Sequence, residues 1–205
     1  MEKLRETTLA QFLAALGSTA PVPGGGTTAA LAGALAAALV EKVTALAQRR
    51  GREVGQALER AQAFREKFLE LAEEDAKAYA AVVEAQKAGG AELERALTRA
   101  AGVPLEVAQK ALGLMDLAER VLTVCPKSAR SDLAAAARLA WAACTAALYT
   151  VDANAPGIRD KKFRAELAKA REELADLAEE KAAFVLAPLE EELSLWLGER
   201  DSNPH

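Results

Sequence analysis

Apolar residues recur along most of the chain at spacings of three and four, the period of an α-helix, and no block alternates as a half-buried strand does. A short amphipathic helix is predicted at about 6–16, and a break rich in glycine and proline follows at 17–26. Two later segments, 29–40 and 131–150, are apolar on nearly every side, which is typical of helices buried at the centre of a bundle. The pattern therefore predicts an all-α chain.

The remaining elements are also predicted to be helices, and we expect them to form one domain over residues 1–205. The predicted helices run from about 27 to 49, 53 to 87, 91 to 101, 104 to 124, 131 to 150 and 159 to 187. Pro104 is placed in the first turn of its helix, where proline is well tolerated. Pro188 marks a kink or a boundary before a terminal segment.

Helix length and apolarity together predict a partner. A helix of about 35 residues extends about 50 Å at ~1.5 Å per residue, more than a compact globule of this size needs. Two helices that are apolar all round also need more cover than one chain easily supplies. We expect a multihelical bundle that forms an intertwined homodimer, with an elongated monomeric bundle as the alternative.

Charge and cysteine content limit the classes of partner and the compartment. A net charge of -4 argues against nucleic acid, because phosphate binding needs a basic surface. The only two cysteines, Cys125 and Cys144, form no CxxC motif and suit a reducing, cytoplasmic environment. The N-terminus lacks the order of a signal peptide, and we expect no apolar run to reach a membrane span of ~20 residues, so we expect a soluble protein. The only histidine is the last residue, His205, so a general acid or base must be another residue type.

The first candidate for chemistry is the segment 21–28, Pro-Val-Pro-Gly-Gly-Gly-Thr-Thr, directly before an apolar helix. Three glycines allow the backbone to approach a ligand closely, and the start of the helix offers unpaired N–H groups. Thr27 or Thr28 can cap the helix or bind a substrate carbonyl. The alternative is a flexible connector with a threonine cap.

The second candidate is Asp75, which interrupts an apolar stripe that includes Phe68 and Tyr79. A carboxylate in that position must either pair with a cation or have its pKa raised by desolvation, which suits acid–base chemistry near neutral pH. The alternatives are a buried ion pair and a cap for a neighbouring helix.

Two further candidates flank the apolar helix at 131–150. Ser131-Asp132 precedes it, and Thr150-Val151-Asp152-Ala153-Asn154 ends it. The plainer interpretations are an N-cap for the first pair and an ordinary turn for the second segment.

Taken in this order, the segments resemble the cyclodeaminase/cyclohydrolase family over about residues 5–165. That family includes the C-terminal domain of formiminotransferase-cyclodeaminase and stand-alone methenyltetrahydrofolate cyclohydrolases. The matching motifs are the Pro21–Thr27 block, with threonine for the family's serine, Asp75-Ala76-Lys77-Ala78-Tyr79, Val103-Pro104-Leu105-Glu106-Val107-Ala108, Ser131-Asp132, and Asn154-Ala155-Pro156-Gly157-Ile158-Arg159-Asp160.

The resemblance implies an intertwined all-α dimer that binds a tetrahydrofolate near the dimer interface. It implies either ring closure of 5-formimidoyltetrahydrofolate with loss of ammonia or hydrolysis of 5,10-methenyltetrahydrofolate, in both cases without a metal or redox cofactor. Asp75 or Asp132 would then transfer the proton. The expected substrate-binding residues are Pro23, Gly24, Gly25, Gly26, Thr27, Ser131, Asp152 and Asn154. A separate formiminotransferase partner is a further implication, since the two activities occur fused elsewhere in the family.

The chain departs from the family pattern in two segments. Pro126 and Ser128 stand where the family has asparagines, and the Thr150–Asn154 segment replaces Asn-Val-Arg-Ile-Asn. Asp152 in place of arginine removes a bidentate donor for carboxylates such as the glutamate tail of folate. Two alternatives to a folate enzyme therefore remain: a catalytically silent helical dimer that binds a folate-like ligand or a protein, and a structural helical interaction protein.

Overall fold

The computed structural model describes residues 4–201, apart from the side chains of 193 and 195–201, and all regular secondary structure in that range is helical. The prediction of an all-α chain is confirmed. The elements are η1 (Leu4–Glu6), α1 (Leu9–Leu16), α2 (Gly25–Arg49), α3 (Ala57–Ala88), α4 (Gly90–Leu122), η2 (Lys127–Ala129), α5 (Arg130–Asn154), η3 (Ala155–Gly157) and α6 (Lys161–Asp201).

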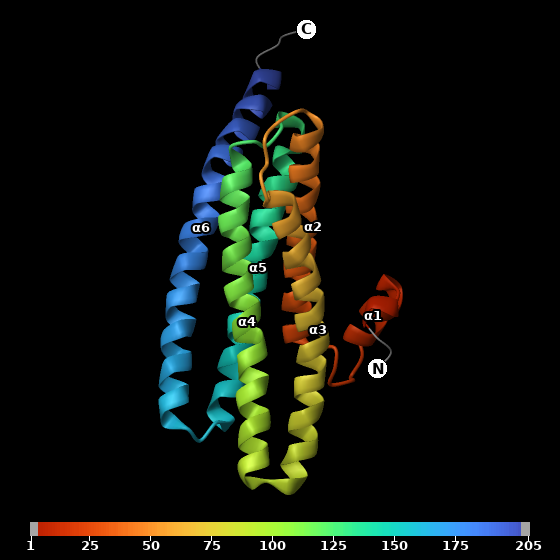
Figure 1. The fold of residues 1–205 in the computed structure, drawn as a ribbon, viewed down its shortest axis with the longest axis vertical. Helices are drawn as coiled ribbons and strands as arrows, with labels where there is room; N and C mark the ends of the chain where they lie inside the picture. The colour runs from red at the N-terminus through yellow and green to blue at the C-terminus, as the bar shows by residue number, and fades with distance from the viewer. Residues whose placement is uncertain (1–3, 202–205) are drawn as a thin grey trace.

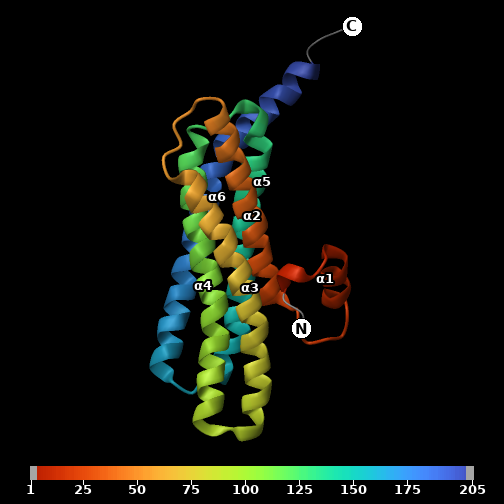
Figure 2. The same cartoon turned by 45° about the vertical axis from the view of Figure 1, so that its right-hand side comes forward.

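The five long helices run up and down in an elongated bundle (Figure 1). Helices α2 and α5 pack against each other, with α3 against α2, α4 against α3 and α5, and α6 against α4 and α5. The hairpin between α3 and α4 extends beyond the first residues of α2, so that both of its helices pass the start of α2 (Figure 1). Helix α1 stands off to the side of the bundle (Figure 2).

Small residues let α2 approach its neighbours closely. The buried positions of α2 are mostly alanine and glycine, and Gly33 faces the ring of Phe68 on α3. A β-carbon at residue 33 would lie only 2.5 Å from that ring. Phe68 is fully buried and stacks on Phe64 with ring centroids 6.4 Å apart. The core therefore depends on glycine on α2 as much as on large side chains on α3.

Several predicted helix ends are wrong. Helix α1 begins at Leu9, because Thr8 and Gln11 form a capping box there. Helix α3 begins at Ala57 and not at 53, because Gly51 and Gly55 adopt positive φ in the preceding loop.

Two prolines predicted to lie at helix boundaries are inside helices. Helix α4 is continuous through Pro104, and α6 is continuous through Pro188. A proline inside a helix leaves the carbonyl four residues earlier without its usual N–H partner. For Pro104 that carbonyl belongs to Ala100, and a side chain from α5 supplies the donor, as described below.

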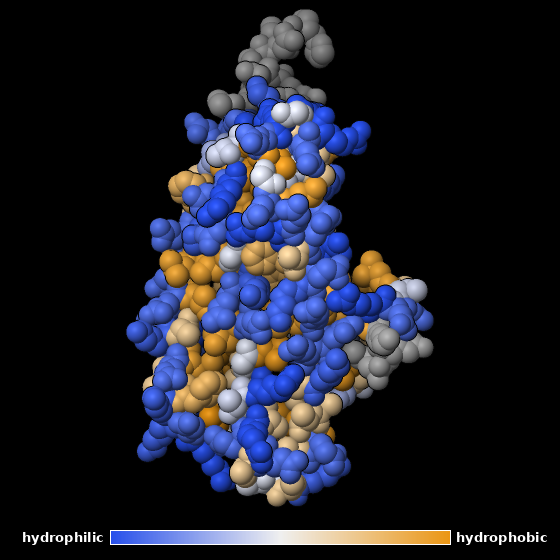
Figure 3. Space-filling view, viewed as in Figure 1, coloured by the Kyte–Doolittle hydropathy of each residue, from blue (hydrophilic) through white to orange (hydrophobic). Residues whose placement is uncertain are grey.

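Two apolar segments meet the length and composition of a membrane span, contrary to the expectation that no such run exists: Gly25–Arg49 and Lys127–Gly157. These segments contain α2 and α5. In the most apolar stretch of each, 50% and 44% of the residues, respectively, are buried inside the bundle. Helices at the core of a bundle meet the same criterion, so this is weak evidence for a membrane span. The face made by α3, α4 and α6 is mainly hydrophilic, with apolar patches between the charged side chains (Figure 3).

Candidate active site at the start of helix α2

A cavity of about 250 Å³ opens where the glycine-rich loop enters α2. It is lined by Pro21, Val22, Gly24, Gly25 and Gly26 from the loop and α2, by Asp75, Ala78, Tyr79 and Val82 from α3, by Ala100 from α4, and by Thr150 and Asn154 from α5. Four helices thus contribute to the lining of this cavity, and three of the segments singled out in the sequence meet there.

The glycine segment forms the first turn of α2. Gly24 is the N-cap in an extended conformation, and the N–H of Thr28 donates to its carbonyl at 3.0 Å. The N–H groups of Gly25, Gly26 and Thr27 come before that first bond and have no acceptor within the helix. The helix dipole adds partial positive charge at this end, so the cavity wall favours an anion or a polar edge of a ligand.

Asp75 makes direct contact with this turn. The hydroxyl of Thr27 donates to Asp75 Oδ2 at 2.8 Å, across 48 positions of sequence. A β-carbon built on Gly26 would lie 2.1 Å from Asp75 Oδ1, which is far less than the sum of the van der Waals radii of the two atoms. Glycine at residue 26 is therefore required for the carboxylate to occupy its place.

Burial raises the pKa of the Asp75 carboxyl above its ordinary value, while the hydroxyl and the backbone amide of Thr27 act in the opposite direction. No cationic side chain within the described residues forms an ion pair with Asp75. The two structural alternatives for Asp75 were a buried ion pair and a cap for a neighbouring helix. Among the described residues the ion pair is excluded, whereas Asp75 does cap the start of α2. The same carboxylate also lines the cavity, so capping and acid–base chemistry are compatible.

The wall beside Asp75 is partly aromatic and apolar. Tyr79 and Val82 follow Asp75 by one and two turns of α3, and Tyr79 is 42% exposed. The sequence placed both residues on the apolar stripe of Asp75 but gave them no role in a site. Spacings of four and seven from a candidate carboxylate were the signal that could have identified them.

Asn154 reaches the cavity from the last turn of α5. Its Nδ2 donates to the carbonyl of Ala100 at 2.8 Å, and both residues line the cavity. Ala100 was missed in the sequence, although a proline four positions later indicates a carbonyl without a helical donor. Thr150, one turn before Asn154, donates back to the carbonyl of Ala146 at 3.4 Å.

Four expected site residues do not line this cavity within one chain, and a fifth, Thr27, is connected to it only through its hydrogen bond to Asp75. Helices α2 and α5 run antiparallel, so the start of α5 lies beside the end of α2. Asp132 pairs with Lys42 at 2.9 Å, which is ~25 Å along α2 from Gly25 at ~1.5 Å per residue, and Ser131 is exposed near it.

Asp152 faces α6 and not the cavity. Its two carboxylate oxygens accept hydrogen bonds from Arg171 at 3.0–3.2 Å, so the acidic side chain links α5 to α6. Pro23 is buried in the loop and does not line the cavity wall. Within the described range, no three His, Cys, Asp or Glu side chains gather as metal ligands.

The fold and the site together define a class: an all-α bundle with a desolvated carboxylate placed against the glycine-rich start of a core helix. The model of the formiminotransferase-cyclodeaminase family matches residues 8–173. The chain belongs to this family.

Named relatives and a solved structure agree with this assignment. A methenyltetrahydrofolate cyclohydrolase from Methylorubrum extorquens is 33% identical over 82% of this chain and 88% of the relative. A formimidoyltransferase-cyclodeaminase from Sus scrofa is 27% identical over 92% of this chain, which spans only 38% of that longer protein. The crystal structure of formiminotetrahydrofolate cyclodeaminase from Thermotoga maritima superposes with a TM-score of 0.83 at 28% identity, covering 92% of this chain and 98% of that one.

Proposed function

We propose that this protein is a folate one-carbon enzyme that hydrolyses 5,10-methenyltetrahydrofolate to the 10-formyl compound. The observation that carries the proposal is the contact of Asp75 with Gly26 and Thr27 at the wall of the cavity. The similarity to a cyclohydrolase over most of both chains supports this choice of substrate.

In the proposed reaction Asp75 acts as the general base. It accepts a proton from water as the water oxygen bonds to the methenyl carbon, which becomes tetrahedral. The new hydroxyl then loses its proton as its bond to carbon becomes a carbonyl and the bond between that carbon and N5 breaks. N5 takes up one proton, which leaves the formyl group on N10, and one proton is released overall. The N–H groups at the start of α2 bind a polar edge of the substrate nearby. No atom changes oxidation state, so the reaction needs no redox cofactor.

A second candidate is the cyclodeaminase reaction, favoured by the likeness to the Thermotoga maritima structure. There N10 attacks the formimidoyl carbon and passes its own proton to the imino nitrogen; protonated Asp75 gives that nitrogen a second proton, and ammonia departs as the bond from carbon to nitrogen breaks. The two reactions require opposite protonation states of one carboxyl, so their pH profiles differ in sign. In the second case a separate formimidoyl-transferring partner would supply the substrate.

The test is turnover of both substrates by the purified full-length protein. We expect loss of the near-ultraviolet absorbance of methenyltetrahydrofolate above the spontaneous rate, and a loss of about 100-fold or more in kcat for Asp75→Asn. Asp152→Asn is the matched control, because Asp152 is bound to Arg171 outside the cavity and its loss should leave kcat within about twofold. Full activity of Asp75→Asn would reject the proposed mechanism.

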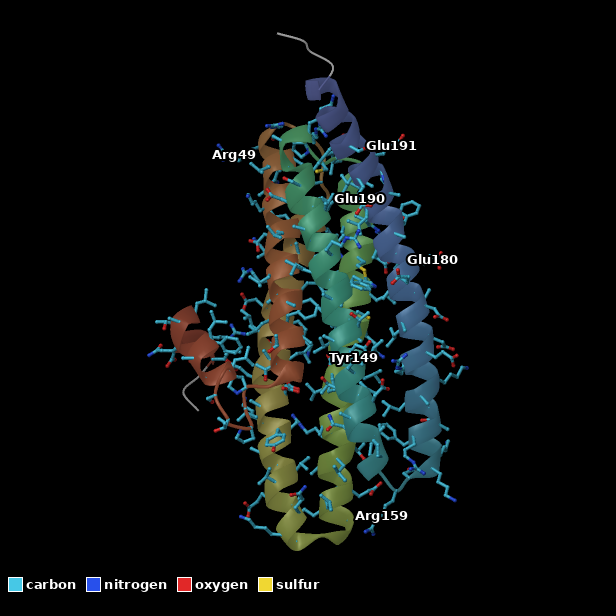
Figure 4. All side chains as sticks on the ribbon, turned by 180° about the vertical axis from the view of Figure 1, so that it is seen from behind. Arg49, Tyr149, Arg159, Glu180, Glu190 and Glu191 are labelled. Carbon is cyan, nitrogen blue, oxygen red and sulfur yellow. The ribbon has the colours of Figure 1, made fainter. Side chains whose placement is uncertain are left out.

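We also propose that the protein is a homodimer that packs through the α2–α5 face. These two helices lie side by side on the face turned to the viewer in Figure 4, with Tyr149 labelled on it. Leu35 and Tyr149 are 61% and 71% exposed, although each belongs to a helix otherwise typical of a core. A second copy would remove this apolar surface from water. Light scattering on the purified protein tests the proposal, and a monomer at micromolar concentration would reject it.

A two-fold axis perpendicular to α2 and α5 would give the Ser131-Asp132 pair a place in the site. Such an axis sets each helix antiparallel to its copy, so the Asp132 end of one chain lies toward the Gly25 end of the other. We propose that Asp132 contributes to catalysis in this way. Mixing Asp75→Asn with Asp132→Asn chains should then restore activity, because one of the two sites in each mixed dimer carries neither substitution. Full activity of Asp132→Asn alone would reject this role.

We place the enzyme in the cytoplasm, because Cys125 and Cys144 are both buried and free and form no disulfide that would benefit from an oxidising compartment. Fractionation of the producing cells tests this, and recovery outside the cytoplasm would contradict it.

A further inference from the structure

The interior of α4 contains a proline whose missing donor is replaced from another helix. Pro104 is buried in the middle of α4 and has no N–H to give to the carbonyl of Ala100, four residues earlier. Asn154 Nδ2 donates to that carbonyl at 2.8 Å across 54 positions of sequence. Since a buried carbonyl without a donor is costly, this bond has a structural reason of its own.

The bond fixes the orientation of the Asn154 amide. Turning the amide over would place Oδ1 against the carbonyl oxygen of Ala100, two acceptors in contact. One N–H of Nδ2 is therefore bound to α4, and Oδ1 is the acceptor of the side chain left for a ligand. No protein donor within the described residues binds Oδ1, and Asn154 lines the cavity.

The same wall carries other acceptors of the same kind. The hydroxyl of Thr150 uses its proton on the carbonyl of Ala146, so its oxygen faces outward as an acceptor. The carboxylate of Asp75 also lines the cavity. One side of the cavity thus presents oxygen acceptors from α3 and α5, opposite in character to the N–H groups at the start of α2.

We propose that Asn154 is a specificity-determining residue: its Nδ2 is bound to the Ala100 carbonyl that Pro104 leaves unpaired, and its Oδ1 accepts a hydrogen bond from an N–H-bearing edge of the substrate. This rests on the proposed function, in which the substrate is a tetrahydrofolate. The amino-substituted pterin ring offers such an edge in its exocyclic amino group and the neighbouring ring N–H. Asn154 discriminates against rings that carry an acceptor or a methyl group at that position.

The test compares binding of tetrahydrofolate and its 2-desamino-2-methyl analogue by titration calorimetry, using full-length variants. Asn154→Ala alone leaves the Ala100 carbonyl without a donor and could unfold. Pro104→Ala restores a helical N–H to that carbonyl, so the double variant Asn154→Ala, Pro104→Ala isolates the binding role from the structural one. Thermal unfolding of each variant verifies that the fold is intact.

We expect the double variant to bind tetrahydrofolate about tenfold more weakly than Pro104→Ala, as the loss of one hydrogen bond predicts, and to bind the desamino analogue equally well. Pro104→Ala alone should weaken tetrahydrofolate binding several-fold without lowering the unfolding temperature, because the amide is then free to turn. The inference is overturned if both ligands lose affinity equally, or if neither Pro104→Ala nor the double variant binds tetrahydrofolate more weakly. Failure of the unaltered protein to bind tetrahydrofolate instead overturns the proposed function and this inference with it.

Discussion

The carboxylate of Asp75 occupies the space that the β-carbon of any residue other than glycine at position 26 would need: the two points lie 2.1 Å apart. Asp75 belongs to α3 and Gly26 to α2, so their contact fixes the carboxylate that we propose as the catalytic group against the start of a core helix. A short aspartate side chain can rotate away from an intruding methyl group at little cost in folding. The contact therefore matters more for the position of the carboxylate than for stability.

Gly26→Ala should lower kcat/KM by about 100-fold or more, because displacing a catalytic group by about 1 Å is enough for a loss of that size. The unfolding temperature should change little. Steady-state kinetics and calorimetry check the two expectations. Gly102→Ala is the matched control, since no atom lies within 4 Å of its β-carbon and residue 102 does not line the cavity; equal activity of Gly26→Ala and Gly102→Ala would contradict the role of Gly26.

Gly33→Ala should instead destabilise the fold. Its β-carbon would lie 2.5 Å from the ring of Phe68, which is fully buried and cannot move into solvent. Overpacking of this kind costs roughly 1–3 kcal/mol in the free energy of unfolding. Gly102→Ala, in α4 with no atom within 4 Å of the added carbon, should raise the same free energy by about 0.5–1 kcal/mol. Urea denaturation measures both, and a stable Gly33→Ala variant would contradict the packing described.

The hydrolysis rate should rise with pH through a value above the ordinary carboxyl pKa of 3.8, because burial raises the pKa of Asp75 and the ionised form is the base. Above that range the profile of kcat/KM should level off until other groups titrate. Measurement of kcat/KM against pH checks this, and a profile that falls as Asp75 ionises would instead identify the protonated carboxyl as the catalytic form.

The same pKa shift affects stability with a definite sign. The native state holds the Asp75 proton more tightly than the unfolded chain, so its contribution to stability is complete below pH 3.8 and is lost as the pH rises through the raised native pKa. Relative to Asp75→Asn, the unaltered protein should therefore become less stable across that window. Denaturation curves at several pH values test the direction; parallel behaviour of the two proteins would contradict it.

The two thiols should be unreactive in the folded protein. Burial raises the pKa of Cys144 from 9.0 to about 11 and also raises that of Cys125. Two pKa units lower the thiolate fraction of Cys144 at pH 8 by about 100-fold, and burial hinders access as well. Titration with a disulfide reagent should detect both thiols quickly only after denaturation. Rapid titration of the native protein would contradict the burial of these residues.

Much of the fold could be predicted from helical periodicity, because each long helix has its own apolar stripe. The helix ends were less predictable where local signals compete with packing. Pro104 and Pro188 are strong breakers in isolation, yet both lie inside continuous helices. For Pro104 the donor that makes this tolerable comes from Asn154 on another helix, and nothing within α4 reveals it.

The candidate site, like the fold, could be predicted only in part from the sequence. Gly24–Gly26, Asp75 and Asn154 were singled out in the sequence and line one cavity, and Thr27, also singled out, is hydrogen-bonded to Asp75. Asp152 was placed with them by motif position alone, but it faces the opposite side of α5 and binds Arg171. Adjacent positions on a helix point about 100° apart, so motif membership does not establish which residues share a wall.

The helices, the unusually apolar character of two of them, the glycine-rich entry to α2 and a carboxylate in an apolar stripe could all be predicted from the sequence, because each depends on residues within a few turns of one another. The packing of the bundle is what places Asp75 against Gly26 and turns Nδ2 of Asn154 toward Ala100. Those relationships join residues 48 or more positions apart and depend on how closely α2 approaches α3, and α5 approaches α4, in the packed bundle.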